Sequence, residues 1–261
     1  MVKANYHTHH ELCNHAQGTT EDYVKEAIKQ GFTDLGMSDH VPSLMNLDSY
    51  RMRFSELEKY YKDVRETAQD YDGKIKLHLG LECEYLEPEA RYYENFLNEV
   101  DYLILGQHYI VQDDRYISTF GLFKPEHIRT YAQDVKKALE SGYFSLFAHP
   151  DIYMCGYDTF DDAAVEAAHI IAKASKETGV PLEFNANGIR RGIKQTSQGK
   201  RYAYPRKEFW DIIRNYDVKI ILSADAHHPS LLYDDAMKDA EAKISEWRLN
   251  VDPYLEFKKR K

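Results

Sequence analysis

Apolar runs of strand length alternate along this chain with stretches of helical periodicity. Seven runs have the character of buried strands, and they lie at 5–9, 35–40, 79–82, 105–108, 146–149, 180–185 and 222–227. Short apolar runs bounded by turn residues are typical of strands covered on both faces. Strands that alternate strictly with helices predict a parallel sheet whose strands are joined by crossover helices.

Helices are predicted between these runs from apolar stripes and end signals. Ser55 with Glu58 matches a capping box ahead of one stripe, and Gly31 ends another. Two further helices are expected over 163–178 and 233–247. Proline suits the first turn of a helix, and three prolines stand at such positions: Pro88, Pro125 and Pro205.

Six of the seven runs end in residue types that bind metals. The carboxyl ends of parallel strands share one face in alternating β/α chains, and that face carries the active site. His7 and His9 are two residues apart on a strand and therefore point to the same side. Glu82 and Asp225 add carboxylate oxygens, and imidazoles suited to zinc, iron or manganese come from His15, His40, His108, His149 and His227. Each residue alone is more often structural, but the whole set predicts a polynuclear metal centre.

This convergence decides between two architectures. A flat sheet separates neighbouring strands by about 4.8 Å, so an open doubly wound sheet keeps its first and last strands apart. A closed barrel brings them together, and seven units favour a distorted (β/α)7 barrel over the regular eightfold one. The chain has 261 residues, of which 43% are apolar, which is enough to bury one core. We therefore expect an α/β protein with a single domain over 1–261.

Charge and cysteine content exclude several classes of protein. A net charge of −9 argues against a nucleic-acid-binding surface. Cys13, Cys83 and Cys155 are too few and too widely spaced for a disulfide framework or a thiolate zinc site. The first run begins within a few residues of Met1, and no apolar run approaches the roughly 20 residues that span a bilayer. We therefore expect a cytoplasmic protein without signal peptide or membrane span.

The strand ends carry an ordered set of motifs. They are His7-Thr8-His9 with His15, Asp39-His40, Gly80-Leu81-Glu82, His108, Ala148-His149-Pro150-Asp151 and Ser223-Ala224-Asp225-Ala226-His227. This set resembles the polymerase and histidinol phosphatase (PHP) superfamily along the whole chain. Within the superfamily, segments 9–16 and 182–190 are similar to the histidinol-phosphatase branch. One departure is Gly106-Gln107-His108, where relatives more often carry Gly-Ser-x-His.

The resemblance implies a trinuclear centre of zinc, manganese or iron. One metal ion would take His7, His9, Glu82 and Asp225, and a second would share Glu82 and add His108 and His149. The third would be held by His15, His40 and His227. Asp39 and Asp151 flank ligands and could orient them or supply a proton, and Glu84 could support the ligands from behind. The histidines expected outside this set are His10, His78, His127, His169 and His228, and Cys13 is expected to be a buried thiol.

A basic segment follows the sixth strand. Residues 186–206 contain six Lys and Arg residues and no acidic residue, which reverses the charge of the chain locally. Arg190 matches the family pattern after this strand, and guanidinium groups bind phosphate oxygens in pairs. We therefore expect phosphate contacts from Arg190, and also from Arg191 and Arg201. The aromatic loops at 41–53 and 110–124 could roof the pocket.

The function that the resemblance implies is phosphomonoester hydrolysis. We expect the protein to convert L-histidinol phosphate to L-histidinol and phosphate, as in histidine biosynthesis, through a metal-bridged hydroxide that attacks phosphorus. The partner would be a small phosphomonoester, without nucleic acid or membrane. Three alternatives stay open: another phosphomonoester such as phosphotyrosine or a nucleotide, amidohydrolase-type C–N hydrolysis, and a non-catalytic metal-stabilised interaction domain. The amidohydrolase hypothesis is weaker, because amidohydrolases usually place a bridging Lys where this chain has His108.

Overall fold

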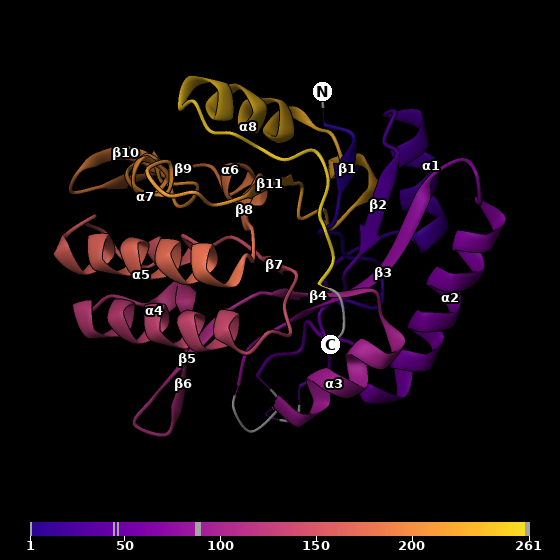
Figure 1. Ribbon diagram of the computed structural model, residues 1–261, viewed down its shortest axis with the longest axis horizontal. Helices are drawn as coiled ribbons and strands as arrows, with labels where there is room; N and C mark the ends of the chain where they lie inside the picture. Colours follow the sequence, from indigo (N-terminus) through magenta and orange to yellow (C-terminus); the bar gives the residue numbers. More distant parts are fainter. Residues whose placement is uncertain (1, 44, 46, 87–89, 259–261) are drawn as a thin grey trace.

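Seven parallel strands form the centre of the molecule. The computed structural model describes residues 2–43, 45, 47–86 and 90–258. The strands lie in the sheet in chain order, and they are β1 (Ala4–Asn5), β2 (Asp34–Met37), β3 (Lys76–Cys83), β4 (Tyr102–Leu105), β7 (Leu146–Phe147), β8 (Leu182–Asn185) and β11 (Ile220–Ser223). A parallel bridge between Thr8 and Ala226 links the chain after β1 to the chain after β11. The ring is therefore nearly closed (Figure 1), which confirms the distorted barrel and excludes the open sheet.

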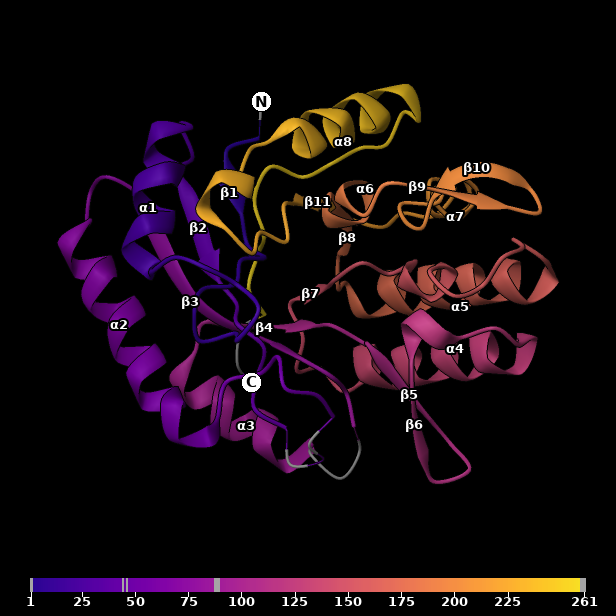
Figure 2. The same ribbon diagram turned by 180° about the vertical axis from the view of Figure 1, so that it is seen from behind.

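Helices surround this ring (Figures 1 and 2). They are α1 (Thr20–Lys29), α2 (Leu57–Asp70), α3 (Ala90–Glu99), α4 (Pro125–Glu140), α5 (Asp162–Thr178), α7 (Lys207–Ile213) and α8 (Asp235–Glu246), with a short α6 (Asn187–Arg190) after β8. Pro125 opens α4 as predicted, and α7 begins two residues after Pro205. Pro88 lies outside the described residues. In the described part of the chain, no helix combines the length and apolar character needed to cross a membrane.

The capping box predicted at Ser55 was wrong. Ser55 lies inside a 3-10 turn, η1 (Phe54–Glu56), and α2 begins after it at Leu57 without a side-chain cap. A capping box does open α1, where Thr19 and Asp22 exchange hydrogen bonds between side chain and backbone. The local pattern at Ser55 is the same as a true box, but the tighter turn takes the place of the helix start.

The amino-terminal end of the barrel is filled by aromatic rings. The Tyr102 hydroxyl donates to the Tyr6 carbonyl oxygen at 2.7 Å, and a Cβ atom on Gly80 would lie 2.3 Å from the Tyr102 ring. Phe257, from the tail that runs to the middle of the ring in Figure 1, stacks on Tyr102 with centroids 4.7 Å apart. These rings occupy the amino-terminal end of the barrel axis, and the predicted metal ligands lie at the opposite end, where the strands finish.

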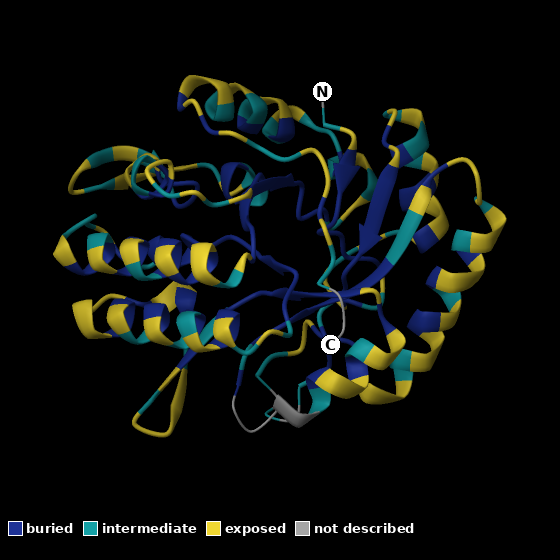
Figure 3. Cartoon of the chain, viewed as in Figure 1, coloured by how far each residue is buried: buried dark blue, intermediate teal, exposed yellow. Residues whose placement is uncertain are grey.

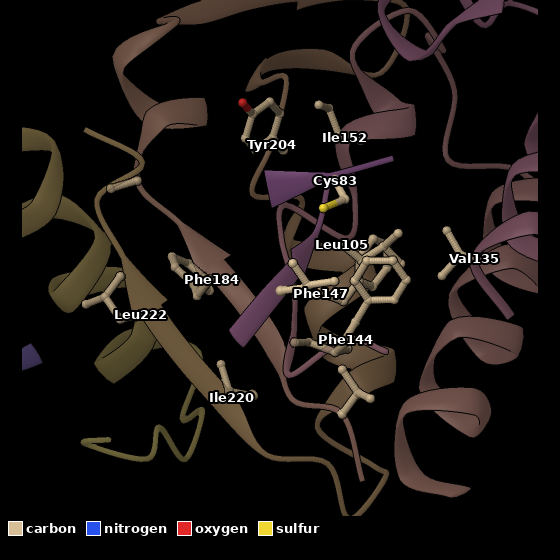
Figure 4. Close-up of a cluster of buried hydrophobic side chains, with 14 of the residues drawn as sticks. Cys83, Leu105, Val135, Phe144, Phe147, Ile152, Phe184, Tyr204, Ile220 and Leu222 are labelled. Atoms are coloured by element: carbon tan, nitrogen blue, oxygen red, sulfur yellow. The ribbon is translucent and has the colours of Figure 1, made fainter. Parts of the chain in front are cut away.

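A second apolar layer lies between the strands and the helices. Figure 4 shows Leu105, Phe147 and Phe184 from three neighbouring strands, with Val135 of α4 on the side of Leu105 and Phe147. Phe184 packs instead against Trp210 of α7, with ring centroids 5.0 Å apart. The seven barrel strands are buried except for the first three residues of β3 (76–78), while the helices expose their outer faces (Figure 3). Burial of each such side chain stabilises the fold by about 1.5–3 kcal/mol. The layer fixes the strands rigidly and so fixes the residues at their ends.

Two antiparallel hairpins extend from the carboxyl end of the barrel. One consists of β5 (Tyr109–Gln112) and β6 (Arg115–Ser118), and the other of β9 (Ile193–Thr196) and β10 (Gly199–Tyr202). Both fall in segments that the sequence predicted only as loops. The first turn places Asp113 and Asp114 at positive φ, a conformation usually signalled by Asn-Gly or Asp-Gly. The sequence has Asp-Asp at this turn and neither of those pairs, which explains why the hairpin was not predicted.

Candidate metal centre

The predicted metal ligands gather at one cavity of about 450 Å³ at the carboxyl ends of the strands. Seven of the nine line it: His15, His40, Glu82, His108, His149, Asp225 and His227. His7 and His9 are fully buried and contact Glu82 and Asp225 from the barrel side. All nine side chains therefore belong to one cluster.

Four of these side chains form a compact cradle of donor atoms. The Nε2 atom of His7 lies 3.2 Å from Glu82 Oε2 and 3.6 Å from Asp225 Oδ1. The Nε2 atom of His9 lies 3.3 Å and 3.5 Å from the same two oxygens. Tetrahedral zinc with bonds of about 2.0–2.1 Å requires donors about 3.3–3.4 Å apart. The cradle therefore has the dimensions of a tetrahedral metal site.

Within the described structure, three of the four cradle atoms lack hydrogen bonds, and so does one nitrogen of the neighbouring His40. Among the described residues, no partner satisfies the buried Nε2 atoms of His7 and His9, Nδ1 of His40 or Oε2 of Glu82. His40 Nδ1 is 2.9 Å from Glu82 Oε2, yet the pair does not have hydrogen-bond geometry. Buried polar atoms without partners are costly, and a cation held among them would remove that cost. The donor set therefore fits a divalent metal ion.

Further donors surround the other oxygen of Glu82. His149 Nε2 lies 3.2 Å and His108 Nε2 lies 3.6 Å from Glu82 Oε1. His40 belongs to two compact donor groups. One contains Glu82 and His108, and the other contains His9 and His227. The ring of His15 lies 5.4 Å from that of His40 and 4.5 Å from that of His227, but within the described chain no compact group of three includes His15. Glu82 thus lies at the junction of the cluster.

Two glutamates orient the histidines from behind. Glu84 accepts hydrogen bonds from His108 at Nδ1 (2.8 Å) and at the backbone N–H (2.6 Å), in the supporting position predicted for it. Glu183 is hydrogen bonded to His7 Nδ1 at 2.9 Å and accepts from the His149 backbone N–H at 3.0 Å. The two contacts at Nδ1 direct the opposite ring nitrogen, Nε2, of His108 and His7 toward the cluster. Glu183 was missed from the sequence, although a carboxylate within an apolar strand was a usable signal.

Asp225 is held by two amides. Asn185 and Asn187 donate their side-chain N–H groups to Asp225 Oδ2 at 3.2 and 3.0 Å, which leaves Oδ1 facing His7 and His9. The backbones of Asp225 and His149 adopt φ of 47° and 32°. Non-glycine residues held in such conformations cost about 1–3 kcal/mol each and concentrate at functional sites. Two proposed ligands therefore carry backbone strain that the surrounding fold maintains.

The electrostatics of the cluster favour charged carboxylates, and they favour neutral imidazoles at His9 and His40. At His7 and His108 the neighbouring carboxylates, Glu183 and Glu84 foremost, outweigh burial and raise the pKa. Burial raises the pKa of Glu82 and of Asp225, but neighbouring imidazoles, His40 and His7 foremost, outweigh burial and hold both pKa values well below their usual range. Burial and the adjacent His227 lower the pKa of His9 to about 4. Burial also lowers the pKa of His40. Ionised oxygens and unprotonated nitrogens are the forms that bind metal ions.

The two other predicted catalytic acids lie outside the cavity wall. Asp39 accepts from the His10 backbone N–H at 2.8 Å and contacts His10 Nδ1. Asp151 accepts from the backbone N–H of Arg206 at 2.6 Å, and burial raises the pKa of its carboxyl to about 7. Neither residue lines the cavity. Cys13 is a buried thiol, as predicted, and contacts His9 Nδ1 at 3.5 Å.

The three predicted phosphate-binding arginines have different surroundings. Arg190 donates to both oxygens of Asp234 (2.7 and 3.0 Å) and to two backbone carbonyls. Arg201 donates to backbone carbonyls, among them that of Tyr157 at 2.8 Å. Arg191 alone of the three lines the cavity, and its guanidinium lies 4.6 Å from the centre of the Phe120 ring. The structure therefore brings Arg191 to the cluster and leaves the other two in structural contacts.

A parallel barrel with histidines and carboxylates clustered at its strand ends is an architecture suited to metal-dependent enzymes. The chain belongs to the PHP domain family, whose model matches residues 5–187. A Deinococcus radiodurans relative named "Probable histidinol-phosphatase" is 25% identical over 249 residues, covering 89% of this chain and 90% of the relative. The histidinol-phosphatase of Bacillus subtilis is 24% identical over 263 residues, covering 87% and 94%.

Solved structures share the fold. That of histidinol phosphate phosphatase from Lactococcus lactis, complexed with zinc, L-histidinol and phosphate, matches with a TM-score of 0.72 at 17% identity and covers 95% of each chain. The predicted fold and family are therefore confirmed.

Proposed function

We propose that this protein is a metal-dependent phosphomonoesterase that hydrolyses L-histidinol phosphate to L-histidinol and phosphate. The observation that carries the proposal is the cradle of unpartnered buried donors around Glu82, at the open end of a PHP-family barrel. Relatives that span most of this chain bear the name histidinol-phosphatase. The Lactococcus lactis protein holds zinc together with both reaction products.

The metal centre would comprise three divalent ions, zinc, manganese or iron. His7, His9, Glu82 and Asp225 would hold one ion, and a second would share Glu82 with His108 and His149. His15, His40 and His227 would hold the third, although His40 also approaches Glu82 at 2.9 Å. Ions in such a centre lower the pKa of water toward neutrality and neutralise charge that develops on a phosphoryl group.

The protein's own groups would bind and orient the substrate. Arg191 would donate to the phosphate oxygens, because it lines the cavity and no carboxylate neutralises it within hydrogen-bond distance in the described chain. Its ring contact with Phe120 limits the freedom of the guanidinium. Tyr50, Phe120 and Tyr204 also line the cavity and would shield the phosphate from bulk water. Asp39 and Asp151 receive no proton-transfer role, because neither reaches the cavity.

Phosphate release from a panel of phosphomonoesters tests the proposal. The panel contains L-histidinol phosphate, phosphotyrosine and a nucleoside 5′-monophosphate, each assayed with zinc-, manganese- and iron-loaded protein. The proposal predicts the highest kcat/KM for L-histidinol phosphate. Preference for another phosphomonoester would keep the phosphatase assignment and reject the substrate. Hydrolysis of none of them by metal-loaded protein would reject both.

A further inference from the structure

We propose that Asp48 binds the ammonium group of the substrate and thereby makes the enzyme selective for amino-alcohol phosphates. The inference rests on the proposed function and extends it to the part of the substrate that is not phosphate. L-Histidinol phosphate carries an ammonium group beside the phosphate ester, so its cavity must satisfy a positive charge as well as a negative one.

Asp48 is singled out by the composition of the cavity wall. Among the described residues that line the cavity, three are acidic: Asp48, Glu82 and Asp225. Glu82 and Asp225 face the histidine nitrogens at 3.2–3.6 Å and belong to the metal centre. Among the acidic side chains of the described cavity wall, Asp48 is therefore the one that lies outside the metal centre and can bind the substrate ammonium.

The carboxylate of Asp48 is oriented but not saturated. Its Oδ2 atom accepts from Arg51 Nε at 3.1 Å and from the Tyr109 hydroxyl at 3.2 Å, and its Oδ1 atom accepts from the Tyr50 backbone N–H at 3.0 Å. A carboxylate offers about four acceptor positions, so Oδ1 keeps one for a ligand. The side chain is 15% exposed, which leaves it accessible yet poorly solvated. A charge-assisted hydrogen bond is strengthened in such surroundings.

The charge balance around Asp48 favours a cation. Arg51 donates to Glu84 Oε1 at 2.6 Å as well as to Asp48, so one guanidinium faces two carboxylates. Glu84 also accepts from His108 at 2.8 Å, but the only cationic partner of Asp48 in the described structure is the shared Arg51. Asp48 is therefore only partly neutralised, and an ammonium would complete its pairing. A phosphate would be repelled from it and drawn to Arg191, which has no such carboxylate partner in the described structure.

The loop that carries Asp48 is tied down before any substrate arrives. Asn14 donates its side-chain N–H groups to the carbonyl oxygens of Ser49 and Arg51 at 3.2 and 2.8 Å. The Tyr50 ring packs 4.9 Å from that of His15, measured between centroids. Asp48 is therefore positioned against the metal centre, and little ordering entropy is lost when it binds an ammonium.

Two substrates separate the role of Asp48 from a structural one. The first is L-histidinol phosphate, and the second is 3-(imidazol-4-yl)propyl phosphate, which lacks only the ammonium group. Asp48→Asn keeps the shape of the side chain and removes its charge. A lost hydrogen bond to a charged group corresponds to a roughly ten- to hundredfold lower kcat/KM for L-histidinol phosphate, mainly through KM. The kcat/KM for the deamino substrate should be unchanged.

The matched control is Asp113→Asn, the same substitution at an exposed turn of the β5–β6 hairpin, which should alter neither substrate. Equal loss for both substrates in Asp48→Asn would overturn the proposal, because Asp48 would then only build the loop. Unchanged kinetics would overturn it as well. A wild-type enzyme that ignores L-histidinol phosphate but hydrolyses other phosphomonoesters would instead reject the proposed function before any variant is made.

A second measurement needs no variant. L-Histidinol should inhibit the wild-type enzyme more strongly than 3-(imidazol-4-yl)propan-1-ol, which lacks the ammonium group. Inhibition by the two alcohols at equal concentrations would show that the cavity does not recognise the ammonium, and the assignment of Asp48 would fall.

Discussion

Gly106→Ala provides a test of the metal cluster through a single methyl group. A Cβ atom on Gly106 would lie 2.0 Å from Oε1, 2.6 Å from Cδ and 2.7 Å from Cγ of Glu82. Ordinary van der Waals contact begins at 3.4 Å, so the carboxylate must move by about 1.4 Å or β4 must move away from β3. Either movement displaces the residue that lies between the donors of His7, His9 and His149.

The expected loss of activity can be estimated because catalysis is sensitive to small displacements of the reacting groups. A misplacement of about 1 Å at reacting groups costs about a hundredfold in rate, which corresponds to about 2.7 kcal/mol of transition-state stabilisation. We therefore expect Gly106→Ala to lower kcat/KM at least about a hundredfold, and to lower the affinity for metal. Overpacking of this kind also destabilises a fold by about 1–3 kcal/mol, so some loss of thermal stability is expected.

Phosphate release, bound metal by elemental analysis and the thermal unfolding midpoint should be measured together. Gly121→Ala is the matched control, because a Cβ atom there meets nothing within 4 Å among the described residues. That variant should retain wild-type activity and metal content. If Gly106→Ala also kept full activity and metal content, Glu82 would not require the position seen in the structure, and its central role would be refuted.

Three further predictions address individual side chains. Glu82→Gln should lower kcat at least about a hundredfold, as removal of a charge-stabilising group typically does. The control His169→Ala, at an exposed position, should leave kcat unchanged. Similar kinetics in the two variants would contradict the assignment of Glu82. Arg191→Ala should raise the inhibition constant for inorganic phosphate about tenfold or more without loss of metal. Arg190→Ala should leave the inhibition constant for phosphate unchanged and lower the thermal unfolding midpoint, because Asp234 loses its partner. A raised inhibition constant with an unchanged midpoint would restore Arg190 as the phosphate ligand.

The positions of the ligands could be predicted because the geometry of parallel strands is regular. Strand ends share one face of a barrel, so His108, His149 and Asp225 had to converge once the strands were identified. The two-residue period likewise placed Glu84 on the same side as Glu82. These inferences need only the order of the elements and the direction in which each side chain leaves the strand.

The roles of the arginines could not be predicted in this way. Arg190 and Arg191 are adjacent at the end of the short helix α6, and neighbouring helical residues point about 100° apart. One therefore meets Asp234 beside α8 while the other reaches the cavity, and the sequence does not say which. Similarly, His40 comes within 2.9 Å of Glu82 because a parallel bridge pairs the two residues, and the sequence does not show this register.

The most direct test of the account is activity as a function of bound metal. Metal-free protein would receive zinc in steps, with phosphate release from L-histidinol phosphate and protein-bound zinc measured at each step. The account predicts no release without metal and a rate that rises to its maximum as three equivalents bind. Hydrolysis by the metal-free protein, or full activity with a single bound ion, would contradict it.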